Sequence, residues 1–399
     1  MEHILFSVFS VLNESRLSAW SEPRRLKPLL AKEIYGAPEG APLQTNARFG
    51  IRARRSSELE QSVMWNHKQT EFGNCVCDAR EGNGMFNRSR CLSVFICLLI
   101  GALFVLPAAE AKRLNVVTAT TDMAALAQEV GGDKISVESI AKGYQDPHFV
   151  EAKPSFLLKL RNADLLIVVG LQLEIGWLPP LISQSGNARI QVGAAGYLDA
   201  SQFAEILDIP QGQVTRAMGD VHPLGNPHYW LDPDNGRRIA RGIAGKLGEL
   251  DPTDAAYFQQ RFQDFDKRLT AAEQKWDAAM RPYRGGKVVT YHNSFPNFAK
   301  HFGLNVIGYV EPRPGIPPTP SHTIELIGLM KRENCKVILV EPYFDLKTPN
   351  AIARETGGKV VQYLPSVGGE KEVTDYFKLF DYDIDLLTKS VSGDPVRGE

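Results

Sequence analysis

From residue 114 onward, short apolar runs alternate with longer amphipathic segments. The apolar, β-branched runs LNVVTATTDM (114–123), KISVESIA (134–141) and DLLIVVG (164–170) predict buried strands. Helical segments follow them: MAALAQEVGG (123–132), which ends in two glycines, and KPSFLLKLRNA (153–163). The pattern continues through RIQVGAA (189–195) to about residue 215. Strands that alternate with helices predict a parallel sheet with helices on both faces.

A second run of the same kind begins near residue 286. The expected strands are GKVVTYH (286–292), LNVIGYV (304–310), CKVILVEP (335–342) and KVVQYLP (359–365). The expected helices are NSFPNFAKHFG (293–303), TIELIGLMKREN (323–334), TPNAIARETGG (348–358) and TDYFKLFDYDIDLLTKSV (374–391). A proline-dense loop, EPRPGIPPTPS (311–321), interrupts this second run.

Two helices separate the runs. The first, 234–252, places Ile239, Ile243 and Leu247 on one stripe. Asp251-Pro252 then predicts a helix start, with Asp as N-cap and Pro as first residue. The polar helix that follows extends to about residue 281, which corresponds to roughly 40 Å at 1.5 Å per residue. This length exceeds one small lobe, so we expect the helix to bridge two.

The predicted fold is therefore α/β, with two lobes of mainly parallel sheet, one long rigid helix between them and a ligand site in the interlobe cleft. We assign 112–250 to the N-terminal lobe, 251–283 to the linking helix and 284–399 to the C-terminal lobe.

The first part of the chain has a different composition. Residues 1–84 are rich in Arg, Ser and Glu, without a sustained period. Residues 85–111 then show a basic start, an apolar run from Cys91 to Leu106 and the small-residue site Ala109-Glu110-Ala111, which is the layout of a signal peptide. The apolar run is shorter than the ~20 residues that a membrane span needs. We expect translation to start at Met85, residues 1–84 to be a non-native or disordered prefix, and the protein to be periplasmic.

Composition and cysteine content agree with a secreted globular protein. The chain has 399 residues, 43% of them hydrophobic and 23% charged, and a net charge of -1, which gives no reason to expect nucleic-acid binding. Cys335 is the one cysteine after Ala111, so an internal disulfide and a lipid-bearing cysteine are both excluded from 112–399. We expect a soluble monomer.

Three histidines follow predicted strands or lie in turn-rich connections. His148 comes after the second strand, His228 lies in NPHYWLDP, and His292 ends the first strand of the second lobe. Ligands of open α/β sheets bind at the carboxyl ends of strands. The spacings are too long for a zinc finger, so these side chains can meet only across a cleft between the lobes. Imidazole suits zinc, copper, iron and nickel.

The other histidines of this part have plainer interpretations. His222 is close to His228 in sequence and is a candidate auxiliary ligand. His301 is interpreted as a surface residue of a helix, and His322 as a neighbour of a helix cap. Each of the three main candidates, taken alone, is also compatible with a polar residue in a turn.

The motifs around the three histidines resemble a known family. DPHFVEAKPS, NPHYWLDP and VVTYHNSFPNFAKHFG are similar to the three histidine motifs of the zinc- and manganese-binding solute receptors of ABC importers, the ZnuA/TroA type. GLQLEIGWL and VILVEPYF also resemble that family. The resemblance covers essentially all of 112–399 and none of residues 1–84.

The resemblance implies a high-affinity periplasmic receptor that captures Zn²⁺ and delivers it to an ABC permease and its ATPase. The metal ligands would be His148, His228 and His292. The third motif carries His where manganese receptors often have a carboxylate, which favours Zn²⁺ over Mn²⁺. The chain contains no Walker motif, so energy for transport must come from the partner chains.

The fourth ligand stays open at this point. The family often uses an Asp in the loop after the last strand, but here that loop is YLPSVGGE, with Pro365 near the expected place. Water, Glu341 and, less favoured, Asp345 are the candidates. Glu341 could instead fix the tautomer of a histidine. A long His-rich loop found in many zinc receptors is reduced here to MGDVHPLG (218–225).

Other functions are less well supported. A receptor for manganese or another divalent metal and a metal-dependent adhesin are compatible with the same motifs. A secreted zinc hydrolase would need a general base, for which Glu341 or Glu151 could serve, but HExxH and G-x-S-x-G are both absent from the sequence. We therefore do not expect an enzyme.

Overall fold

The computed structural model describes residues 113–215 and 218–392, and the predicted prefix and signal peptide lie outside them. The strands are β1 Leu114–Thr118, β2 Ile135–Ser139, β3 Leu165–Val168, β4 Tyr197–Asp199, β5 Lys287–Thr290, β6 Asn305–Tyr309, β7 Val337–Val340 and β8 Lys359–Gln362. The α-helices are α2 Thr121–Gly131, α3 Pro154–Asn162, α4 Leu178–Ser185, α5 Pro233–Leu250, α6 Ala255–Met280, α7 Pro296–Phe302, α8 Pro320–Arg332, α9 Lys347–Thr356 and α10 Tyr376–Ser392. In the described part, no helix is both long and apolar enough to cross a membrane.

The strands form two four-stranded sheets with the same arrangement. Their orders are β2-β1-β3-β4 and β6-β5-β7-β8, and the pairings are parallel. In each sheet, the second strand along the chain lies on one side of the first strand, and the third and fourth strands lie on the other side. This reversal creates a topological switch point, where ligands of such sheets bind. The predicted fold class, two parallel α/β lobes, is confirmed.

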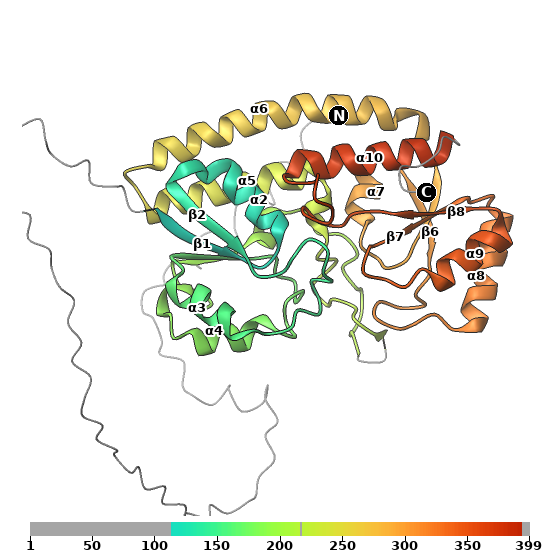
Figure 1. The fold of residues 1–399 in the computed structure, drawn as a ribbon, viewed down its shortest axis with the longest axis horizontal. Coiled ribbons are helices and arrows are strands. Elements are labelled where there is room, and N and C mark those ends of the chain that lie inside the picture. Colours follow the sequence, from blue (N-terminus) through green and yellow to red (C-terminus); the bar gives the residue numbers. More distant parts are fainter. Residues whose placement is uncertain (1–112, 216–217, 393–399) are drawn as a thin grey trace, which may run out of the picture. The chain divides into compact units, whose positions relative to one another are not determined.

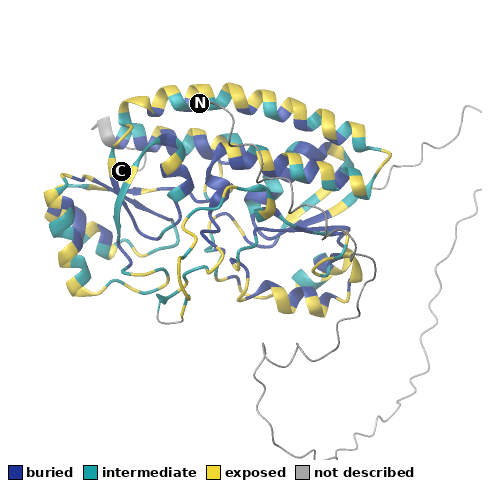
Figure 2. Ribbon diagram, turned by 180° about the vertical axis from the view of Figure 1, so that it is seen from behind, coloured by how far each residue is buried: buried dark blue, intermediate teal, exposed yellow. Residues whose placement is uncertain are grey.

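Alternate residues of the buried strands enter different cores. In β3, Leu165 and Ile167 join a core shared by the two sheets, whereas Leu166 and Val168 join a core beneath α3 and α4. In β7, Ile338 likewise faces a separate core formed with α8 and α9. Strands β3 and β7 are apolar and buried at every residue because both of their faces are covered. Figure 2 shows the buried parts of the two sheets in dark blue.

Helix α6 covers the shared core and runs across both sheets in Figure 1, whereas α10 packs against α6 over the C-terminal sheet. Helix α6 is attached near both ends. Arg261 Nε donates to the Glu129 carbonyl of α2 at 2.8 Å, and Trp276 stacks on Phe380 of α10 with centroids 4.9 Å apart. Its outer face is exposed in Figure 2. Helix α6 is therefore in contact with helices of both lobes.

Two local predictions are wrong. The long helix begins at Ala255, because Asp251 closes α5 and its Oδ1 accepts from the backbone N–H groups of Thr253 and Asp254. RIQVGAA is a 3₁₀ turn at Ala188–Ile190 followed by loop, and the strand comes later, at Tyr197. Asp-Pro indicated a helix start, and the β-branched residues of RIQVGAA indicated a strand. At both places, side-chain hydrogen bonds in turns determine the local backbone conformation instead. Helix α4 was not predicted.

Candidate metal centre

Three histidines from distant parts of the chain meet between the two sheets. One side-chain nitrogen from each of His148, His228 and His292 lies within 4.8 Å of the other two. Their ring centroids are 5.2 to 5.4 Å apart. His148 lies in the connection between β2 and α3, His228 precedes a 3₁₀ turn at Tyr229–Leu231, and His292 follows β5. The three predicted residues are thus brought together.

The Nδ1 atom of each ring is held by a side-chain oxygen. The distances are 2.7 Å from His148 to Asp146 Oδ1, 2.9 Å from His228 to Asn226 Oδ1, and 2.9 Å from His292 to Glu311 Oε2. Since Nδ1 donates its proton to each oxygen, the lone pair is on Nε2. Each ring therefore presents a basic nitrogen to the centre.

The first two motifs share one local geometry. In Asp146-Pro147-His148 and in Asn226-Pro227-His228, the first side chain accepts from both the backbone N–H and the Nδ1–H of the histidine two residues later. Proline presets the intervening φ, and this turn fixes the ring orientation. The sequence analysis missed these orienting residues, although the repeated Asx-Pro-His pattern was a usable signal. Glu311 had no comparable local signal.

His228 has an unsatisfied nitrogen deep in the protein. The residue is 1% exposed, and its Nε2 has no hydrogen-bond partner. Burial, and then the neighbouring histidines, hold the pKa of His228 well below its usual value. A neutral imidazole with an orphaned buried lone pair is costly unless a cation occupies the position.

A cavity of about 90 Å³ opens onto His222, His228 and His292, with room for an ion and a few waters. Asn226 Nδ2 donates to the Asn293 carbonyl at 2.8 Å, which joins the two lobes beside the cavity. The lining residues are Asp208, Asp220, Val221, His222, Gly225, Asn226, His228, His292, Asn293 and Pro314. The cavity is therefore lined by residues of both lobes, most of them polar.

The candidates for the fourth position lie in different places. Glu341 is fully buried with Oε1 2.5 Å from Ser294 Oγ, and its Oε2 has no partner. Burial raises the pKa of Glu341 to about 8. Asp345 is exposed and accepts from the Lys347 N–H at the start of α9. The Pro365 carbonyl accepts from Trp230 Nε1.

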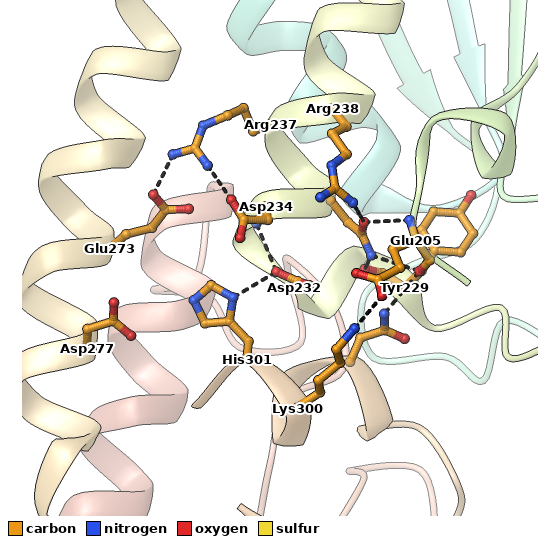
Figure 3. A network of polar contacts seen from close by, with 12 residues as sticks. Glu205, Tyr229, Asp232, Asp234, Arg237, Arg238, Glu273, Asp277, Lys300 and His301 are labelled. Atoms are coloured by element: carbon orange, nitrogen blue, oxygen red, sulfur yellow. Dashed lines mark hydrogen bonds and ion pairs between the residues drawn. The ribbon is translucent and has the colours of Figure 1, made fainter. Parts of the chain in front are cut away.

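A second group of potential ligands lies at the start of α5 (Figure 3). Asp232 Oδ1 accepts from the Asp234 N–H and from His301 Nδ1, each at 2.9 Å. Asp234 pairs with Arg237 at 2.6 Å. The prediction that His301 is a surface residue is wrong, since its side chain is 12% exposed and binds a buried carboxylate of the other lobe. His301 occupies a polar position on α7, and the N-terminus of α5 covers that position in the folded protein.

Comparison with known proteins identifies the family. The model of one family, described as "Zinc-uptake complex component A periplasmic", matches residues 116–390. The chain belongs to this family. Its members are solute-binding components of metal uptake systems, so the protein is a transport protein rather than an enzyme. The resemblance stated from the three motifs is confirmed.

The known relatives align with this chain over most of their own length. The metal ABC transporter substrate-binding lipoprotein FimA of Streptococcus parasanguinis is 25% identical over 312 residues, which is 75% of this chain and 97% of FimA. The iron-binding protein YfeA of Yersinia pestis is 28% identical over 304 residues, with 71% and 88% covered.

Solved structures show the same fold. A crystal structure of ZnuA has a TM-score of 0.59 at 24% identity and covers 70% of this chain and 99% of its own. A zinc-bound ZnuA deletion mutant has a TM-score of 0.60 at 25% identity and covers 71% and 100%. The described part of the chain thus has the fold of these ZnuA structures.

Proposed function

We propose that this protein captures Zn²⁺ through His148, His228 and His292 and delivers it to an ABC permease driven by its ATPase. The observation that carries the proposal is that three histidines meet with one ring nitrogen each within 4.8 Å, while an oxygen engages the Nδ1 of every ring and leaves Nε2 as the free nitrogen. Such an arrangement is pre-organised for a cation. The relatives' names support transport, since FimA is a substrate-binding lipoprotein of a metal ABC transporter.

The donor set supports zinc over manganese. One nitrogen of each histidine is available to the centre, and the neighbouring carboxylates of Asp146 and Glu311 are engaged with Nδ1 of His148 and His292. Manganese prefers carboxylate and water oxygens, whereas imidazole suits zinc. The relatives are named as manganese, iron and general metal binders, so the metal must be decided on this chain's own ligands.

Release would require small movements. The lobes share a core and α6 is attached near both ends, so large rotation between them would break buried packing. His148 and His228 are carried by loops, and His228's neighbour Asn226 reaches across to Asn293. Docking on the permease would open this contact and turn the histidine loops outward.

Calorimetry tests the proposal. Chelator-stripped protein is titrated with Zn²⁺ and with Mn²⁺, alongside His148→Ala, His228→Ala and His292→Ala. We expect one tight zinc site per chain, weaker manganese binding, and a loss of more than about 100-fold in zinc affinity for each variant. Equal zinc binding by wild type and all three variants would make the histidines structural.

We propose that the protein is exported to the periplasm by the signal peptide predicted at 85–111. The exported chain would consist of lobes at 112–250 and 284–399, joined by the linking helix at 251–283. The support is the layout of the sequence and the family's description as periplasmic. N-terminal sequencing of the secreted protein would be expected to begin at Lys112. Fatty acylation of the secreted protein would contradict it.

A further inference from the structure

A fourth imidazole lies beside the three predicted ligands. His222 Nε2 is 3.2 Å from His148 Nε2, and the two ring centroids are 5.3 Å apart. His222 also lines the same cavity as His228 and His292. Its segment, 218–225, directly precedes the motif that carries His228.

The ring of His222 is oriented like the other three. Its Nδ1 lies 3.1 Å from the Leu171 carbonyl, an acceptor, so the proton is on Nδ1 and the lone pair is on Nε2. The residues that present this carbonyl, Leu171 and Gln172, have φ of 53° and 68°, an uncommon left-handed conformation for side chains of their size. All four imidazoles therefore have Nδ1 engaged by an oxygen.

The short distance between the two Nε2 atoms requires an explanation. With both Nδ1 atoms donating, two lone pairs face each other across 3.2 Å, where they repel. Two nitrogens on one tetrahedral zinc ion are about 3.3–3.4 Å apart, given Zn–N bonds of 2.0–2.1 Å. The pair is thus at the spacing of two ligands of a single ion, and a cation between them would remove the repulsion.

The segment that carries His222 is positioned from both lobes. The Asp220 N–H donates to the Pro314 carbonyl of the C-terminal lobe at 2.8 Å, while His222 binds Leu171 of the N-terminal lobe. The Gly315 N–H in turn contacts Glu311, which holds His292. The segment therefore spans the cleft where the three ligands meet.

The two carboxylate candidates are placed less favourably. Glu341 hydrogen-bonds to Ser294 through Oε1, and although its Oε2 has no partner, the residue does not line the cavity. Asp345 is exposed and accepts from the Lys347 N–H at the start of α9. His222 is the remaining candidate that already lies within ligand spacing of a predicted metal ligand.

We propose that His222 supplies the fourth nitrogen ligand and makes the centre an all-imidazole site selective for zinc over manganese. The inference rests on the proposed function, since it adds a ligand to the same centre. His222 is not in the group of three whose ligand atoms lie within 4.8 Å of one another. Its Nε2 therefore moves inward when the ion binds, so that the 218–225 segment closes over the loaded site.

Cobalt spectroscopy and competition titration test the proposal. His222→Ala, His222→Asp and, at the competing candidate, Glu341→Gln are compared with wild type, using Co²⁺ as a spectroscopic probe and then Zn²⁺ and Mn²⁺. We expect His222→Ala to weaken zinc binding by about 10- to 100-fold and to change the d–d absorption of bound Co²⁺. His222→Asp should retain Co²⁺ with an altered spectrum and lower the zinc-over-manganese ratio at least tenfold. Glu341→Gln should match wild type.

The outcomes separate this inference from the proposed function. Wild-type zinc affinity and cobalt spectrum in His222→Ala, together with loss of binding in His228→Ala, would overturn the role of His222 and leave the three-histidine receptor intact. A spectral change in Glu341→Gln but not in His222→Ala would assign the fourth position to Glu341. Undiminished binding in His228→Ala would overturn both proposals. Circular dichroism of the metal-free variants checks folding.

Discussion

Two clusters among the described residues bring three potential metal ligands within 4.8 Å of one another, and they differ in whether the lone pairs of those ligands are free. At the centre formed by His148, His228 and His292, oxygens hold the outer nitrogens and the inner ones point at each other. In the cluster of Asp232, Asp234 and His301, hydrogen-bond donors already occupy the oxygens.

The difference lies in the compensating charge. Arg237 pairs with Asp234 and Asp266 at 2.6 Å each and also with Glu273, so a guanidinium stands where a metal would otherwise be needed (Figure 3). The histidine centre has no such cation among its described contacts, and His228 Nε2 is left unpaired. Proximity of ligand residues therefore identifies a metal site only when their lone pairs remain free.

Replacing a central histidine should give the largest effect. At zinc concentrations of 1,000 times Kd, binding should stabilise the wild type by about 4 kcal/mol, because only the folded state has the site. His228→Ala should lose nearly all of this gain. Urea denaturation with and without zinc measures it. If zinc raised the unfolding midpoint of His228→Ala as much as that of wild type, the proposed difference in metal binding between the two clusters would be contradicted.

Replacing Arg237, the cation beside the second cluster, should lower stability without changing zinc affinity. Arg237→Ala leaves Asp234, Asp266 and Glu273 without their shared partner, and we expect a loss of about 2–3 kcal/mol in the free energy of unfolding. Zinc affinity should be unchanged. The matched control is Lys246→Ala on the same helix, whose pair with Glu249 is exposed and should contribute about 0.5 kcal/mol or less. Equal losses in the two variants would contradict the network.

The orienting residues should have a smaller effect on binding. Asn226→Ala frees His228 Nδ1 and should weaken zinc affinity about 10- to 100-fold. Asn226→Asp is the matched variant, because Asp146 performs the same role for His148, and it should bind zinc close to wild type. Competition titration with a chromogenic chelator measures the zinc affinity of the wild type and of the two variants. Similar affinities for the Ala and Asp variants would show that the orientation of His228 does not depend on this oxygen.

The smallest effect is a pH dependence of stability in metal-free protein. Burial acts to lower the pKa of His301, but the hydrogen bond and charge of Asp232 outweigh it, so the pKa is raised above 6.5. The resulting stabilisation is fully present below the unfolded pKa and is lost as pH rises through the raised folded value.

His301→Gln should therefore flatten the decline in unfolding free energy as pH rises from about 6 to 8. Denaturation curves at several pH values check this, with His322→Gln as a control, since the His322 ring bonds a backbone carbonyl rather than a carboxylate. A slope in His301→Gln equal to that of wild type would show that Asp232 does not hold a protonated imidazole.

Sequence reasoning succeeded where the signal is local. Apolar runs and amphipathic periods predicted the two parallel lobes, and the positions of His148, His228 and His292 at strand ends and turns predicted their meeting. Those signals depend on near neighbours along the chain, because side-chain period and turn residues set local backbone conformation.

What only the tertiary structure decided are the contacts between residues far apart in the chain. It paired Glu311 with His292, brought His222 to His148, and buried His301 against Asp232. It also merged one face of each sheet into a single core beneath α6 and α10. These choices follow from how the lobes pack, since a histidine becomes a ligand, an ion-pair partner or a surface residue according to which oxygens and nitrogens surround its ring.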